Sequence, residues 1–251
     1  MTSVQRSDDP NGVTAEAPLG QTGAGGSSPF LVRASDGRRY WCKALNNPQG
    51  SRVPVNDQIV ARLGRLVGIG VCEPMLVEIP SDLVGHVYQQ GLALEAGWVH
   101  GSLAVEGVTE TRVLGHHTDD ENRKRHAGFV ALHDWLVGGD DQWLVSGDEE
   151  NKYYSHDHGH YFSQHGGPNW TAEALRQDAS APVPLPGADP QHLDQAEMSR
   201  LADGLEALTP EEIAEELANI PSSWPVTDEE LEAVVGFADQ RRTGVATRLR
   251  G

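Results

Sequence analysis

Three aspartates in the middle of the chain have the residue type and spacing for phosphate and metal chemistry. Asp140 and Asp141 come directly before a short apolar stretch at residues 142–146, and Asp157 follows a second stretch at residues 153–156. A polar turn between the stretches predicts a β-hairpin, which can bring the carboxylates to one end. Closely placed carboxylates beside a glycine turn commonly hold a divalent cation against a phosphate. The alternative is a surface hairpin with solvated acids.

Lys43 is the basic residue best placed to meet such a phosphate. It lies in the expected strand at residues 39–45, where alternation puts it on the same face as Trp41 and Leu45. A lysine on an apolar strand face needs an anionic partner or a route to water. The alternative is an edge-strand lysine that discourages association between sheets.

Asp57 follows Lys43 in what we expect to be the first turn of a helix. A carboxylate there interacts favourably with the helix dipole. It could also form an ion pair that positions Lys43, and the two interpretations are compatible.

A glycine and serine stretch precedes the first expected strand. Gly25, Gly26, Ser27 and Ser28 could wrap backbone amides around a phosphate. A flexible linker has the same composition, so both interpretations stay open.

Alternating histidines suggest a different chemistry. In an extended segment, His156, His158 and His160 would lie on one side and Asp157 on the other. A His/Asp-rich metal-dependent hydrolase could use such a cluster. The sequence has no helical His-x-x-x-His pair or other recognised zinc spacing to support it.

The elements that must position these residues follow from apolar periodicity. Residues 30–33 and 39–45 predict a hairpin, a helix opens at Pro54 and closes at Gly68, and residues 71–79 predict another strand. Together they describe a small α+β unit. Residues 80–112 are ambiguous, with a possible strand at 91–99.

The second half of the chain reads as mainly helical. A helix is expected from about Glu121 and stops at Gly138, just before the paired aspartates. Residues 165–180 predict a loop with at most one helical turn. The last sixty residues predict helices, two of which open with capping boxes at Thr209 and Thr227.

Charge and composition exclude several partner classes. The 251 residues contain 37 acidic and 19 basic residues, for a net charge of -18. This balance argues against nucleic acid and against an anionic membrane surface, but a small anionic nucleotide remains compatible. The two cysteines give no disulfide framework, and the chain has neither a secretory signal nor a long apolar run. We therefore expect a cytoplasmic protein.

The order of these parts resembles a protein-kinase-like phosphotransferase, and more specifically the HipA-like kinase family. The resemblance rests on five segments spread over residues 24–170. They are Gly25-Gly-Ser-Ser-Pro-Phe-Leu-Val, Gly37-Arg-Arg-Tyr-Trp-Cys-Lys43, Asn47-Pro-Gln-Gly-Ser-Arg-Val-Pro-Val-Asn-Asp57, Gly138-Gly-Asp-Asp-Gln-Trp-Leu-Val and Ser155-His-Asp-His-Gly-His-Tyr-Phe.

The resemblance implies a role for each candidate in binding ATP. The loop of Gly25, Gly26, Ser27 and Ser28 would cover the phosphates. Lys43 would hold the α- and β-phosphates, and Asp57 would orient it, although the family usually has glutamate there. Aspartate is one methylene shorter.

The resemblance also implies the catalytic and metal-binding residues. Asp157 opens the Asp-x-Gly segment and would bind Mg²⁺, with His158 in place of the usual phenylalanine. Asp141, or with less support Asp140, would accept the proton of the attacking hydroxyl. Kinases place a metal-binding asparagine five residues after that aspartate, and this chain has none; Gln142 is the nearest candidate.

These inferences predict an α+β, two-lobed protein-kinase-like fold with a small β-rich N-lobe containing one helix and a larger helical C-lobe. We expect a disordered tail at residues 1–24, the N-lobe at 25–100 and the C-lobe, with the catalytic hairpin, at 101–251. The predicted function is ATP- and Mg²⁺-dependent transfer of a phosphoryl group to a hydroxyl of a protein Ser/Thr or of a small molecule. A catalytically inactive nucleotide- or partner-binding protein of the same fold and the metal-dependent hydrolase are the alternatives.

Overall fold

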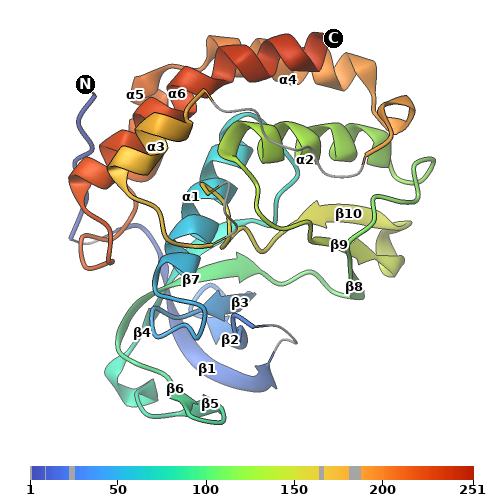
Figure 1. Ribbon diagram of the computed structural model, residues 1–251. Coiled ribbons are helices and arrows are strands. Elements are labelled where there is room, and N and C mark those ends of the chain that lie inside the picture. The colour runs from blue at the N-terminus through green and yellow to red at the C-terminus, as the bar shows by residue number, and fades with distance from the viewer. Residues whose placement is uncertain (1, 9, 23–25, 164–166, 181–187) are drawn as a thin grey trace.

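The computed structural model describes residues 2–8, 10–22, 26–163, 167–180 and 188–251. Most strands gather at one end and most helices at the other, with α1 (Arg52–Leu66) between them (Figure 1). No helix among the described residues is long and apolar enough to cross a membrane.

Five strands close into a small barrel in the order β1-β2-β3-β7-β4. Their bounds are β1 Val13–Thr22, β2 Phe30–Ala34, β3 Arg39–Lys43, β4 Pro74–Ile79 and β7 Gly97–Leu103. The predicted hairpin is β2 and β3, which pair antiparallel around the turn at Gly37. β7 continues past the expected domain boundary at residue 100, because its residues up to Leu103 pair with β3 and β4.

The disorder expected over residues 1–24 is wrong for residues 13–22, which form β1. Only small or modest apolar side chains alternate along this stretch, so its sequence carries a weak strand signal. Its order comes from backbone pairing with β2 along most of its length and with β4 at Val13 and Thr14. Such non-local pairing leaves no mark on local composition.

Helix α1 packs against the barrel on one side and the helical end on the other. Val55, Ile59 and Leu63 are fully buried, in agreement with the predicted apolar face. The helix starts at Arg52, two residues before Pro54, and ends before Gly68, whose φ of 78° suits glycine. Asp57 therefore lies in the second turn, and the helix-dipole interpretation is wrong.

The predicted catalytic hairpin is part of a three-stranded sheet in the order β10-β9-β8. The strands are β8 Val108–Thr111, β9 Trp143–Ser146 and β10 Lys152–Ser155. β8 falls in the stretch that the sequence left ambiguous, as does the small hairpin of β5 (Val87–Gln89) and β6 (Leu92–Ala93). At Ser155 the sheet meets the rest of the chain through a parallel bridge to Val71.

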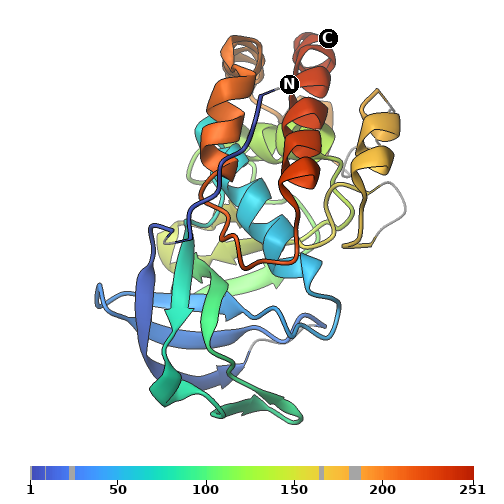
Figure 2. The ribbon, with the colours of Figure 1, turned by 90° about the vertical axis from the view of Figure 1, so that its left-hand side faces the viewer.

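The helices share one large apolar core with the inner face of α1. They are α2 Asn122–Leu136, α3 Ala172–Asp178, α4 Gln195–Ala207, α5 Pro210–Leu217 and α6 Asp228–Arg250. Both predicted capping boxes are present at the start of α5 and α6. The N-terminal residues run beside α5 and α6 before they reach β1 (Figure 2).

Candidate active site

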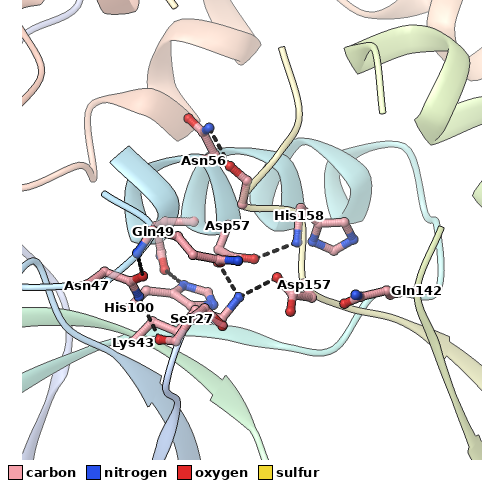
Figure 3. Close-up of polar contacts among 12 residues, drawn as sticks. Ser27, Lys43, Asn47, Gln49, Asn56, Asp57, His100, Gln142, Asp157 and His158 are labelled. Carbon is pink, nitrogen blue, oxygen red and sulfur yellow. Dashed lines mark hydrogen bonds and ion pairs between the residues drawn. The ribbon is translucent and has the colours of Figure 1, made fainter. Parts of the chain in front are cut away.

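Lys43 lies at the centre of a buried charged cluster. It ends β3 opposite His100 of β7, and only 7% of the residue is exposed. Its Nζ donates to Asp57 Oδ2 at 2.8 Å and to Asp157 Oδ1 at 2.6 Å (Figure 3). Burial alone would lower the pKa of Lys43, but the two carboxylates raise it above its ordinary value. The lysine is therefore charged, with two anionic partners.

Asp57 connects the lysine to the Asp-x-Gly segment. It projects from α1, is almost fully buried, and uses its second oxygen to accept the backbone N–H of His158 at 2.6 Å. One carboxylate thus fixes both the Lys43 ammonium and the residue next to Asp157. The shorter aspartate makes this contact directly, at a position where glutamate is usual in the family that the sequence resembles.

Asp157 is the most accessible of the three charged groups, with 26% of its side chain exposed. Burial raises its pKa, but the charge of Lys43 outweighs this effect and lowers the pKa to about 2. Its backbone φ is 55°, in the left-handed region. This turn breaks the extended alternation that the histidine argument assumed.

A cavity of about 300 Å³ opens beside this cluster. Trp41, Val105 and Leu144 contribute apolar walls, whereas Lys43 and Asp157 form a charged end. A flat apolar group and a polyanion could therefore bind in one continuous space, with the anion next to the ammonium.

A smaller polar recess of about 50 Å³ shares Asp157 and Ser27 with this cavity. Asp140, Gln142, Ser27 and Asp157 are among its lining residues. Gln142 Nε2 donates to Asp140 Oδ2 at 3.0 Å, and its amide is directed toward Asp157 (Figure 3). Its Oε1 is buried and has no hydrogen-bond partner among the described residues.

The donors of this recess fit a hard divalent cation. The Asp157 carboxylate and the unpaired amide oxygen of Gln142 are oxygen ligands of the kind that Mg²⁺ prefers. In the described part of the chain, no group of three or more His, Cys, Asp or Glu side chains is arranged to hold a metal. The recess therefore suits a cation that takes only some of its ligands from the protein.

The paired aspartates face different surroundings. Asp140 lines the recess, whereas Asp141 lies outside it, with Oδ1 3.5 Å from His133 Nε2. Of the two candidate bases, Asp141 was expected first from the sequence, but only Asp140 lines the recess. Adjacent residues in an irregular loop project in different directions, which no local pattern foretells.

The glycine and serine stretch is only partly within the described residues, because Gly25 lies outside them. Ser27 lines both cavities, and Gly26 lines the polar recess. Ser28 is buried, with a φ of 48°. The stretch adjoins the site, as a loop that covers phosphates would.

Comparisons with known proteins identify the family and the fold of this chain. The sequence pattern of the HipA-like kinase family matches residues 18–247. The chain belongs to the HipA-like kinase family. No curated protein matches the sequence significantly.

Solved structures show which fold this HipA-like kinase has. The proinflammatory kinase CtkA of Helicobacter pylori is similar with a TM-score of 0.57 and 11% identity, over 95% of this chain and 98% of that one. The fold is therefore protein-kinase-like with mixed α/β content, and its closed five-stranded barrel is unusual. The Golgi casein kinase is more distant, with a TM-score of 0.47 and 9% identity over 98% of this chain and 73% of that one.

Two residues that the sequence did not single out as candidates, Asn47 and Gln49, support the glycine and serine stretch of this HipA-like kinase. Asn47 is buried, and its Nδ2 donates to Ser27 O at 2.8 Å while its Oδ1 accepts the Gln49 N–H at 3.0 Å (Figure 3). Gln49 also lies against Gly26, where an added Cβ would be 2.5 Å from Gln49 Nε2. The composition of residues 46–50, Asn-Asn-Pro-Gln-Gly, is typical of a loop but does not indicate how that loop packs.

His100 is a further residue that the sequence did not single out, and it lines the cavity beside Lys43. Burial lowers the pKa of His100 to about 4, so the ring is neutral, and its Nδ1 lies 2.7 Å from Gln58 Oε1. Position 100 falls opposite Lys43 in the ladder, so strand pairing, once known, would have found it.

The histidines flanking Asp157 do not form the metal cluster of the hydrolase alternative. His156 and His158 line the large cavity, whereas His160 lines the small recess. His158 is buried, its Nε2 lies 2.8 Å from Ser155 Oγ, and burial lowers its pKa to about 3. It packs as a neutral ring at the position where kinases carry phenylalanine.

Proposed function

We propose that this chain is an ATP- and Mg²⁺-dependent phosphotransferase that acts on a hydroxyl acceptor. The single observation that carries the proposal is the convergence of Lys43, Asp57 and Asp157 from three separate elements at the charged end of one cavity. Membership of a kinase family supports the reaction class.

The residues divide the work between binding and chemistry. Lys43 holds the α- and β-phosphates, Asp57 keeps its ammonium in place, and the apolar walls accept the base. The loop of Gly26, Ser27 and Ser28 adjoins the phosphates, and Gly25 completes it in sequence. Positioning and charge neutralisation supply most of the rate in this reaction class.

Asp157 and Gln142 would hold Mg²⁺ in the polar recess. The ion would neutralise charge on the phosphates. We assign Asp140, rather than Asp141, as the base that accepts the proton of the attacking hydroxyl, because Asp140 lines this recess.

The acceptor is a protein Ser/Thr or a small molecule. The net charge of -18 favours a basic or neutral acceptor and disfavours nucleic acid and anionic membranes. Both cysteines are free and buried, which suits a reducing compartment such as the cytoplasm.

Thermal shift with ATP, with and without Mg²⁺, tests the nucleotide site. We expect wild type to be stabilised by ATP with Mg²⁺, by about 2.7 kcal/mol at a hundredfold excess over Kd. Asp157→Ala should lose the Mg²⁺-dependent part, and Lys43→Ala should lose nearly all of the response. The absence of any ATP response in wild type would refute the proposal.

Transfer assays with radiolabelled ATP and a basic protein or small hydroxyl acceptor test the base. Asp140→Asn should lower transfer about 100-fold or more without weakening ATP binding. Asp141→Asn should remain close to wild type. The reverse ranking would return the role to Asp141.

A catalytically inactive nucleotide-binding protein is the second candidate. The absence of an asparagine five residues after either Asp140 or Asp141 favours it, because Gln142 would then have to take the usual metal-binding role. Wild type that binds ATP with Mg²⁺ but transfers phosphate to no acceptor, including water and itself, would select this function.

A further inference from the structure

Helix α1 holds the chain segment after Asp157 through a residue that takes no part in the charged cluster. Asn56 precedes Asp57 and is fully buried. Its Nδ2 donates to Gly159 O at 2.8 Å and to Pro168 O at 3.0 Å, and its Oδ1 accepts the Trp170 indole N–H at 2.8 Å. One amide thus uses three hydrogen bonds to tie together two stretches of this segment, residues 157–163 and 167–170.

Neighbouring contacts hold the same stretches against α1. An added Cβ on Gly159 would lie 2.7 Å from Val53 Cγ1, so the backbone there is in direct contact with the helix. The Arg52 guanidinium lies over the Trp170 ring at 4.8 Å and pairs with Glu230 of α6. The segment is therefore fixed to α1, and α1 is fixed to the helical end.

Asn56 and Asp57 form hydrogen bonds with neighbouring backbone groups of the turn at Gly159. Asp57 accepts the N–H of His158, and Asn56 donates to the carbonyl of Gly159 (Figure 3). Asp157 lies directly before this turn, so the direction of its carboxylate depends on both bonds. The hydrogen bond from Trp170 to Asn56 holds a later part of the same segment against α1.

We infer that Asn56 is a positioning residue for the metal-binding carboxylate of Asp157. This inference rests on the proposed function. It extends that function by naming what sets the geometry of the metal site.

The test compares Asn56→Ala with Asn122→Ala in the full chain. Asn122 is also fully buried and also makes three hydrogen bonds, to His116 O, Asn151 O and the Tyr153 N–H, but it does not line either cavity. Both variants should lower the melting temperature, because each leaves buried backbone groups without partners.

The readout is the Mg²⁺ concentration that gives half of the ATP-dependent thermal shift, together with ATP affinity measured without Mg²⁺ by calorimetry. Asn56→Ala should raise this Mg²⁺ concentration about tenfold. Its metal-free ATP affinity should stay at the wild-type value, and Asn122→Ala should keep the wild-type Mg²⁺ dependence. A wild-type Mg²⁺ dependence in Asn56→Ala, or an equal change in Asn122→Ala, would overturn the inference.

A milder variant serves if Asn56→Ala does not fold. Trp170→Phe keeps both donor bonds of Asn56 and removes the N–H that orients its amide, while a smaller aromatic ring stays under Arg52. It should shift the Mg²⁺ dependence in the same direction by a smaller factor, and no shift would overturn the inference. Wild type without any Mg²⁺-dependent ATP response would instead refute the proposed function itself, and the inference with it.

Discussion

The buried side chain of His126 contributes to the loss of folding stability at low pH. It is fully buried on α2, and neither ring nitrogen has a hydrogen-bond partner among the described residues. The ring packs edge-on against Tyr153 and His117, at centroid distances of 4.9 and 5.4 Å. Burial, with smaller contributions from His117 and Arg125, lowers its pKa to about 4.

We predict that His126→Phe reduces the loss of stability in acid. Below pH 6.5 the unfolded chain binds a proton at this histidine that the folded chain does not bind until about pH 4. Stability therefore falls as pH falls through this window, by about 1.4 kcal/mol per pH unit for each such histidine. Urea denaturation at pH 7 and pH 5 should show a difference smaller by about 1 to 2 kcal/mol in the variant.

An exposed histidine provides the control for this measurement. His86→Phe changes a side chain that meets water in both states, so the pH difference should equal that of wild type. A wild-type pH difference in His126→Phe would contradict the role given to this ring.

Individual site residues could be predicted from sequence only where their own environment marked them. Lys43 stood out because an ammonium in an apolar strand needs a partner, and Asp157 because a glycine turn follows it. The choice between Asp140 and Asp141 and the role of Asn56 depend on where an irregular loop and a distant segment lie. Those positions are set by packing across more than one hundred residues of chain, which composition does not record.

At the scale of elements, α6 begins with a capping box that the sequence alone predicts. Thr227 accepts the Glu230 N–H through its side chain, and the Glu230 carboxylate accepts the Thr227 N–H in return. The box lies within four residues, so the sequence alone predicted it. β1 is the opposite case, because its partners lie in β2 and β4 and its own residues carry little strand preference.

We predict that Thr227→Ala lowers the free energy of unfolding by about 1 kcal/mol, because a helix amide loses its cap. Thr247→Ala is the matched control: Thr247 is an exposed threonine in the last turn of the same helix, and its hydroxyl donates to Thr243 O. It should change stability by less than about 0.5 kcal/mol. Chemical denaturation measures both, and equal effects would contradict a capping role.

At the scale of the whole molecule, the N-terminal segment connects the barrel to the helical end. Val4 is buried in the main apolar core, and Arg6 pairs with Asp228 at the start of α6 at 2.6 Å. A few residues later the chain enters β1. A second connection runs from Trp224 Nε1 to Trp98 O at 3.0 Å. The two ends of the molecule are therefore joined outside the active site.

We predict that Val4→Asp lowers the free energy of unfolding by about 2 kcal/mol or more, because it places a carboxylate in an apolar core. Gln5→Asp adds the same charge one residue later, at an exposed position, and should change stability by less than about 0.5 kcal/mol. Denaturation of the two variants in parallel measures the difference. Equal stability would mean that the segment does not pack as described.

The short parallel pairing of β1 with β4 has a consequence for how the protein behaves among its own copies. An open sheet presents a row of unpaired amides and carbonyls, which can recruit a strand from another molecule. The Val13–Val77 and Thr14–Glu78 pairs join β1 to β4 and so close the barrel. The barrel therefore offers no such row of unpaired groups along this seam between β1 and β4. The stretch of chain that looked least structured in the sequence thus protects the five-stranded barrel from edge-to-edge aggregation along this seam.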